Sequence, residues 1–592
     1  MADHTLPPNS ILLFWPTGKP HDIGIMNVLS IALLTALAGG SHESPAETSQ
    51  PADHKRPKLV LQITIDQFRG DLIRRYADRW GEGGFRKFLD EGAVFANAHH
   101  AHANTETIVG HSTLATGAFP ATHGMIGNVW MNRKDGGAQY TVEDAKYPVI
   151  STKPLIDQDT EIDPTQRAAR SDGRSPRALL VSTFGDELKL FTGAHAKVFG
   201  VSIKDRAAIS LAGHTGQAYW FSKSTGEFVT SRYYQEAYPE WVKSWNAAGH
   251  VSRYANTSWE LAREQSGYLF GDRDDRPYET ALPGFGRTFP HAYGAAEDKY
   301  FTTFLTLSPA GDDITLGFAK ALIENEQLGQ DEVTDYLSVS FSATDYVGHM
   351  FGPSSLEAED NLLRLDRTLA DLLAFVDSSV GLDETLIVLS ADHGGPEVPG
   401  YLRSLGFDAA YIATSDEIAA AVQADLEAKF GVKENLVRGF FHPYVYLDRA
   451  AIADNKLDLD AVASVVAATL ESQAGIAHAF TSRAMRKGEY PELRVANAVR
   501  RNHNSKRSGD VYIVTDPNHF VNDFDGLHVA ATHGSPWRYD THVPIIFLGS
   551  EIKAQTIQRE VLTVDVAASL AALVGTLPPS GCDGEPLVEL FR

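Results

Sequence analysis

The chain has 592 residues, of which 43% are hydrophobic and 10% aromatic, so global disorder is excluded. Its formal charge of −24 argues against nucleic acid as a main partner, because phosphate backbones attract a basic surface. The single cysteine, Cys582, excludes an intrachain disulfide and a thiolate zinc cluster. Any bound metal must therefore be held by Asp, Glu and His.

The N-terminal region has the pattern of an export signal. Residues 26–38 form an apolar run that ends in Ala-Leu-Ala, a small-residue cleavage pattern, and the run is too short to span a bilayer comfortably. We predict a signal peptide over residues 1–38, with Met26 as an alternative translation start, and a disordered linker over 39–57. A hydrophobic tail without export is the alternative. The expected location is periplasmic or extracellular, with no stable membrane span.

Short apolar runs of the kind found in buried parallel strands follow the linker. Between the third and fourth runs, residues 356–379 carry leucines on one helical face, which predicts a strand, helix and strand crossover. The predicted fold is α/β, with a mostly parallel central sheet sandwiched by helices in a single catalytic domain over 58–592. The predicted strands are 58–65, 196–203, 336–342, 385–390 and 543–549.

Two long intervals interrupt this pattern and are predicted to be insertions that cap the sheet. They cover about 215–330, which is rich in aromatic and turn residues, and about 396–530, which is mixed. Within the first interval, Tyr219, Trp220 and Phe221 could roof the site or could form the core of a capping hairpin. We favour the hairpin core.

Charged side chains follow four of the predicted strands. Ligands of open α/β sheets bind at the carboxyl ends of the strands, where these side chains are expected to meet. Each one alone is better explained as a turn residue or helix cap, but carboxylates and imidazoles together form the zinc ligand set when thiols are absent. The residues are Asp66; Lys204 and Arg206; Asp345 and His349; and Asp392 and His393.

Two further features complete the candidate site. His533, in Thr-His-Gly-Ser, is the preferred additional ligand, with His542 as the alternative nearer to the last strand. Residues 102–117, HANTETIVGHSTLATG, hold five hydroxyl side chains. This stretch alone does not decide whether one of them is a nucleophile or whether all are helix caps and turn residues.

Several motifs together resemble the alkaline phosphatase superfamily, and within it the zinc-dependent, PafA-like bacterial alkaline phosphatases with a threonine nucleophile. The similarity runs from Lys58 to the C-terminus. The motifs that carry it are ITIDQFRGD, TETIVGHSTLATGAFPATHGMIGNVW, SIKDRAAI, SATDYVGHMFGP, LSADHGG and THGSPWRYDTHVPIIFLG.

The resemblance implies a nucleophile, two Zn²⁺ sites and a phosphate-binding set. The nucleophile falls on Thr107, with Thr105 as its rival and a helix N-cap as the structural alternative. The implied ligands of the first metal are Asp345, His349 and His533; those of the second are Asp66, Asp392, His393 and the Thr107 oxygen; and the phosphate-binding residues are Asn128, Lys204 and Arg206.

The implied activity is broad hydrolysis of phosphate monoesters through a phosphothreonine, with inorganic phosphate as product. A nucleotide pyrophosphatase or phosphodiesterase of the same superfamily is the alternative, and the Lys204 and Arg206 pair disfavours it. A sulfatase is disfavoured because the chain has no C/S-x-P-x-R motif, and a phosphomutase-like relative because of the insertions. A silent phosphate- or metal-binding protein is the remaining hypothesis. The oligomeric state is left open.

Overall fold

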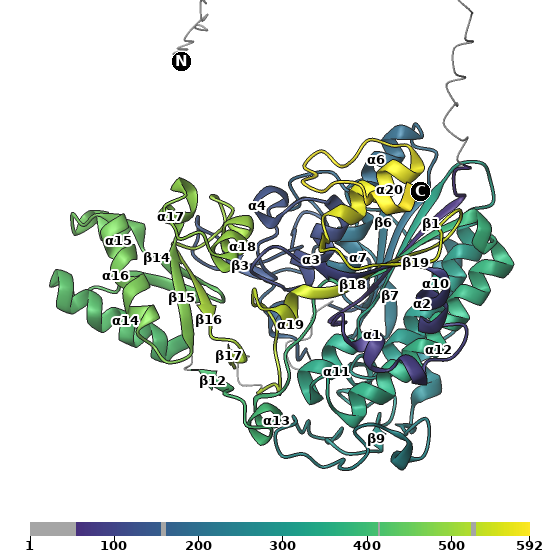
Figure 1. The fold of residues 1–592 in the computed structure, drawn as a ribbon, viewed down its shortest axis with the longest axis horizontal. Helices are drawn as coiled ribbons and strands as arrows, with labels where there is room; N and C mark the ends of the chain where they lie inside the picture. The colour runs from purple at the N-terminus through teal and green to yellow at the C-terminus, as the bar shows by residue number, and fades with distance from the viewer. Residues whose placement is uncertain (1–54, 155–160, 413–414, 523–527, 592) are drawn as a thin grey trace, which may run out of the picture. The chain divides into compact units, whose positions relative to one another are not determined.

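A computed structural model of the chain describes residues 55–154, 161–412, 415–522 and 528–591 (Figure 1). The predicted signal peptide and almost all of the predicted linker lie outside these residues. Within the described ranges, no helix is both long enough and apolar enough to cross a bilayer.

A ten-stranded sheet forms the centre of the fold. Its strand order is β19-β2-β18-β11-β1-β10-β5-β6-β7, with β20 also paired to β2. The strands β11, β1, β10 and β5 are mutually parallel, as the four apolar runs before residue 400 predicted, and β6, which was predicted as part of an insertion, is parallel to β5. The bounds of these five are Thr385–Ser390, Leu59–Ile65, Asp335–Phe341, Val198–Ser202 and Gln217–Ser222.

The last predicted strand runs in the opposite direction to the prediction. β18 (His542–Gly549) is antiparallel to both β11 and β2 (Ala93–His99). The remaining strands of the sheet are β7 (Glu227–Val229), β19 (Gln555–Ile557) and β20 (Val561–Leu562). An apolar run that is buried on both faces reads the same in either direction, so its sequence carries no sign of its orientation.

Helices cover both faces of the sheet (Figure 1). Leu61 and Ile63 of β1 pack with α2 (Phe85–Glu91), α10 (Pro309–Glu326) and α12 (Leu356–Ser379) in one apolar cluster. Val60, on the opposite face of the same strand, packs with α3, α6 and α20 in another. These last helices span Thr107–Thr116, Phe184–Phe191 and Asp565–Val574. The sandwiched α/β architecture is as predicted.

The predicted first insertion begins inside the sheet. Its first strands, β6 and β7, form a hairpin that extends the sheet edge. Tyr219, Trp220 and Phe221 of β6 are buried core residues, which agrees with the hairpin alternative. The later α8 (Glu240–Ala247) and α9 (Phe301–Thr306) pack on α10, which itself covers the sheet.

The second predicted insertion forms its own small sheet. Its order is β13-β14-β16-β15, all antiparallel, and α16 (Leu459–Glu471) packs on it together with α14 (Ser415–Phe430). A separate apolar cluster lies between these elements. The strands span Val437–Phe441, Tyr444–Leu447, Val511–Thr515 and Ile476–Thr481.

Candidate active site

The proposed nucleophile lies at the start of a buried helix. Thr107 is the first residue of α3, and the preceding residue, Glu106, is the N-cap, so the reading of Thr107 itself as the cap is off by one residue. The rival hydroxyl of Thr105 donates a hydrogen bond to the Ser535 carbonyl at 3.0 Å. Thr113 and Thr116 donate their hydroxyls to carbonyls one turn earlier in α3, as packing residues do.

One group of predicted metal ligands gathers at the ends of β1 and β11. Asp66 follows β1, and Asp392 and His393 follow β11, which is its direct neighbour in the sheet. His393 Nε2 lies 3.5 Å from Asp66 Oδ1 and 3.3 Å from Asp392 Oδ2. All three side chains are fully buried.

A second group centres on Asp345. Asp345 and His349 are one turn apart on α11 (Ala343–Phe351), the helix that follows β10. His349 Nε2 and His533 Nε2 each lie 3.3 Å from Asp345 Oδ1. His533 Nδ1 donates to the Thr105 carbonyl at 2.7 Å, and His349 Nδ1 donates to the Ala531 carbonyl at 2.8 Å. Such contacts fix the ring and leave Nε2 for a metal.

The donor atoms fit metal ions by their chemistry and by their lack of other partners. Two triads have ligand atoms within 4.8 Å of one another, and they share His393: Asp66, Asp392 and His393; and Asp345, His393 and His533. Among the described residues, Asp66 Oδ1 and His393 Nε2 are buried without a hydrogen-bond partner. Carboxylates and imidazoles are zinc ligands, and burial without partners is costly unless a cation is present. His349 belongs to neither triad, but its Nε2 atom lies close to Asp345, which is a member of the second triad.

Burial and neighbouring charge set the protonation of these groups. Burial holds the pKa of His393 well below its ordinary value, so the ring is neutral, which is the form that binds metal. Burial and the Asp392 carboxylate raise the pKa of Asp66 despite nearby Lys204. Burial would also raise the pKa of Asp345, but His349 and Lys204 outweigh it and lower that pKa.

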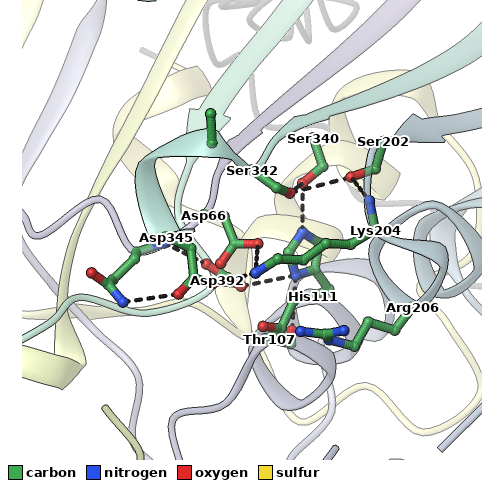
Figure 2. A network of polar contacts seen from close by, with 12 residues as sticks. Asp66, Thr107, His111, Ser202, Lys204, Arg206, Ser340, Ser342, Asp345 and Asp392 are labelled. Atoms are coloured by element: carbon green, nitrogen blue, oxygen red, sulfur yellow. Dashed lines mark hydrogen bonds and ion pairs between the residues drawn. The ribbon is translucent and has the colours of Figure 1, made fainter. Parts of the chain in front are cut away.

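Lys204 lies among the ligand carboxylates. It precedes α7 (Asp205–Ala212), and its Nζ is 2.8 Å from Asp66 Oδ2 and 2.5 Å from Asp345 Oδ2. Figure 2 shows the Lys204 side chain directed toward these aspartates. To bind phosphate, as the resemblance implies, the Lys204 ammonium would have to contact phosphate oxygens, whereas here it contacts the two aspartates. Its ammonium neutralises two ligands, one from each group.

Arg206 and Asn128 face the same cavity as Thr107. Arg206 Nη1 donates to Asp163 Oδ2 at 3.0 Å, which holds the guanidinium against the cavity wall. The side-chain Oδ1 of Asn128 accepts the Ile108 N–H of α3 at 3.2 Å, and the backbone N–H of Asn128 donates to the Glu106 carboxylate. Asn128 is therefore tied to the first turn of the nucleophile helix.

This cavity of about 520 Å³ lies beside the Asp345 group, whereas Asp66, Lys204, Asp392 and His393 are not among its lining residues. Its polar lining includes Thr107, Asn128, Arg206, Asp345, His349 and His533. The predicted residues from five separate parts of the chain thus meet around one space. His542, the alternative ligand, donates its Nε2 hydrogen to the Ala96 carbonyl at 3.2 Å and is not among the lining residues.

Sequence reasoning missed Gln67, which connects the two ligand groups. Its side-chain amide donates to Asp345 Oδ1 at 2.8 Å, and its backbone N–H donates to Asp392 Oδ1 at 3.1 Å. Gln67 has a φ of 61°, in the left-handed region that a non-glycine residue rarely adopts. In the sequence, Asp-Gln after a predicted strand indicates only a turn.

A direct backbone contact joins the nucleophile helix to the Asp392 loop. A Cβ atom on Gly110 would lie 1.8 Å from the Asp392 carbonyl oxygen, so no larger residue fits without movement of the backbone. His111 Nδ1, one residue later, lies 2.8 Å from the Thr107 carbonyl and 3.1 Å from Asp392 Oδ2. The spacing between Thr107 and the ligands of this loop is therefore set by packed main chain.

Comparisons with known proteins place the chain in a family. The family model of type I phosphodiesterase / nucleotide pyrophosphatase matches residues 60–536. Alkaline phosphatase PafA of Elizabethkingia meningoseptica is 34% identical, with 90% of this chain and 95% of that protein covered. Alkaline phosphatase PhoV of Synechococcus elongatus is 33% identical, with 95% and 99% covered. A Myroides odoratus protein named calcium-transporting ATPase is 34% identical, with 91% and 95% covered.

A crystal structure of wild-type alkaline phosphatase PafA superposes with a TM-score of 0.82 at 32% identity, covering 91% of this chain and 99% of that one. The chain therefore belongs to the type I phosphodiesterase / nucleotide pyrophosphatase family, within the alkaline phosphatase superfamily. It is a phosphatase-type hydrolase.

Proposed function

We propose that the enzyme hydrolyses a broad range of phosphate monoesters through a phosphothreonine at Thr107, with two zinc ions as cofactors. The observation that supports this most directly is the single cavity lined by Thr107, the Asp345 ligand group, Asn128 and Arg206. Asp345, His349 and His533 would hold one ion, and Asp66, Asp392 and His393 the other, with the Thr107 oxygen beside the latter. Zinc at these positions would supply Lewis acidity, which favours an ionised hydroxyl and stabilises phosphate charge.

The chain's own residues account for the bond changes. Thr107 Oγ attacks phosphorus, and the bond between phosphorus and the ester oxygen breaks, releasing an alcohol that takes a proton from solvent. Water then attacks the phosphothreonine, which frees inorganic phosphate and restores the hydroxyl. The N-terminus of α3, at the positive end of the helix dipole, favours a phosphoryl group on its first residue.

Selectivity for monoesters is assigned to the cations near the phosphoryl group. Arg206 suits a forked grip on phosphate oxygens, and Asn128 adds a neutral donor. Lys204 can act as a point charge there once metal ions neutralise Asp66 and Asp345. A monoester dianion offers one more non-bridging oxygen than a diester, whose second ester arm would meet these residues.

A diesterase or nucleotide pyrophosphatase is the second candidate, because the matching family model carries that description. The test is a ratio. The zinc-loaded protein is assayed for kcat/KM on an aryl phosphate monoester and on the matching diester. We expect the monoester to be preferred by orders of magnitude and Arg206→Ala to reduce that ratio. A preference for the diester would assign the protein to the second candidate, and no turnover of either would favour a silent binder.

We also propose export to the periplasm or the medium, on the basis of the apolar run at 26–38. Mass spectrometry of the protein recovered from cell fractions tests this. A mature N-terminus just after Ala38 in the exported fraction is the expected result, whereas an intact N-terminus in the cytoplasm would contradict it.

A further inference from the structure

The cavity over the site is lined in part by a hairpin from outside the main sheet. β13 ends at Phe441, the turn is His442 and Pro443, and β14 begins at Tyr444, which pairs with Phe441. This hairpin belongs to the small four-stranded sheet, yet Phe440, Phe441 and His442 all line the cavity of the active site. Each of the three is half-buried.

The hairpin tip reaches from the phosphate-binding side of the site to the metal-binding side. On one side, β13 packs against β3 (Val129–Met131), which begins directly after Asn128. On the other side, a Cβ atom on Gly534 would lie 3.9 Å from His442 Nε2, and Gly534 directly follows His533. The two aromatic rings and the imidazole are therefore placed against the same space as the reacting groups.

The size and chemistry of the cavity exceed what a phosphoryl group requires. Pockets of several hundred Å³ with apolar walls and a few polar groups bind small organic molecules, and this one measures about 520 Å³. The polar side chains of the lining are sufficient to bind the phosphoryl group of a substrate. The apolar lining has no role in phosphate binding and includes Val129, Ile162, Met350, Phe440, Phe441 and Val521.

His442 adds a polar group without adding charge. Its Nδ1 atom is buried and, within the described residues, has no hydrogen-bond partner. Burial lowers the pKa of the ring to about 4, so it is neutral at neutral pH. A neutral ring next to two phenyl rings suits an uncharged aromatic group better than a sugar phosphate or a second anion.

We propose that Phe440, Phe441 and His442 form a subsite for the alcohol portion of the substrate, which favours monoesters whose alcohol carries an uncharged aromatic ring. This inference rests on the proposed monoesterase function. The rings contribute by burying the aromatic surface of the substrate. Phe440 packs against one apolar cluster and Phe441 against another, and this packing keeps both rings in place at the cavity wall.

The test compares two substrates with similar leaving-group chemistry, 2-phenylethyl phosphate and ethyl phosphate, on the zinc-loaded full chain. Both release a primary alcohol, so the ratio of their kcat/KM values reports contacts to the ring. We expect a ratio of roughly tenfold in favour of the phenylethyl ester, as for partial burial of one ring. Replacing Phe440 and Phe441 together with alanine should bring this ratio close to one. Phe440→Leu is the milder variant if the double variant does not fold.

Phe407→Ala provides the matched control, because Phe407 lies in the same inserted region but is 56% exposed and does not line the cavity. It should leave the ratio unchanged. Turnover of both esters at equal kcat/KM, or a ratio that survives loss of both rings, would overturn the subsite while leaving the monoesterase function intact. Absence of turnover for either ester would contradict the proposed function itself.

Discussion

Lys204 Nζ lies 2.5 Å from Asp345 Oδ2, and the same ammonium is 2.8 Å from Asp66 Oδ2. One cation thus holds together one carboxylate from each of the two ligand groups. Burial would lower the pKa of Lys204, but the attraction of Asp345 and Asp66 raises it, so the side chain stays charged. The two aspartates are consequently kept close to each other by the protein itself.

Replacing Lys204 with methionine should therefore destabilise the metal-free protein more than the zinc-loaded protein. Without the ammonium, two buried carboxylates lose their partner, which costs about 3–5 kcal/mol unless another cation takes its place. The measurement is Tm by calorimetry, with chelator and with zinc. Lys197→Met is the control, since Lys197 is one-third exposed and 3.9 Å from Asp335. An equal loss of Tm in both states would mean that metal ions and Lys204 do not share these carboxylates.

Thr107→Ala should reduce monoester kcat/KM by roughly 10³-fold or more, because the reacting oxygen is removed. Thr107→Ser keeps the hydroxyl and should retain most of the activity. Thr105→Ala is the matched control, since the Thr105 hydroxyl already donates to the Ser535 carbonyl. Acid-quenched enzyme should carry a covalent phosphate on the peptide that contains Thr107. A label on any other residue, or full activity of Thr107→Ala, would refute the assignment.

Gln67→Met should weaken metal binding by about 10–100-fold, the usual cost of losing a residue that orients metal ligands. Methionine keeps the apolar bulk between Gly348 and Gly395 but cannot donate to Asp345. Zinc affinity is measured by competition with a chelating dye. Gln62→Met is the control, since Gln62 is a buried glutamine in the preceding strand β1 that contacts Tyr336 instead, and this change should not alter zinc affinity. Unchanged affinity in Gln67→Met would restrict Gln67 to a structural role.

Asp312→Asn should stabilise the protein at high pH. Burial raises the pKa of Asp312 to about 8 from an ordinary value of 3.8. At pH values between these two, the folded state keeps a proton on Asp312 that the unfolded state has lost. The free energy of unfolding therefore falls as pH rises through this range. Asparagine does not ionise and can still accept the Ala343 N–H bond at 3.1 Å.

The Tm difference between Asp312→Asn and wild type should accordingly be larger at pH 8.5 than at pH 5.5, by a few degrees. Asp383→Asn, on an exposed turn, should show the same difference at both pH values. If the Asp312 variant gained no stability at pH 8.5, the carboxyl would not be held neutral in the folded protein.

The sequence allowed prediction of the strands that carry the site, because long apolar runs followed by charged residues reveal both burial and position. It could not reveal the direction of β18, which depends on the path of the chain between 396 and 541. Gln67 was missed for a different reason. One polar residue next to Asp66 is indistinguishable from a turn residue until Asp345 and Asp392 are brought to it.

The aromatic wall of the cavity comes from a segment that the sequence did not single out, while the aromatic run at 219–221 forms the hairpin core that was the favoured prediction. Tyr219, Trp220 and Phe221 alternate along β6 and are all covered by other elements. Phe440 and Phe441 look like an ordinary strand end in the sequence. Their place beside the site depends on how the small sheet packs on β3, a contact between segments about 300 residues apart that local patterns do not encode.

The close approach of Gly110 to the Asp392 carbonyl leaves no side chain whose rotation could alter the distance between the nucleophile helix and the ligand loop. The hairpin tip at Phe440–His442, in contrast, presents side chains that can be exchanged one at a time. Laboratory evolution for new esters should therefore accumulate changes in the hairpin and leave Gly110 untouched. Mutations that adapt the enzyme to a new alcohol would then lie in one part of the gene, and the codons that preserve the chemical step would lie in another.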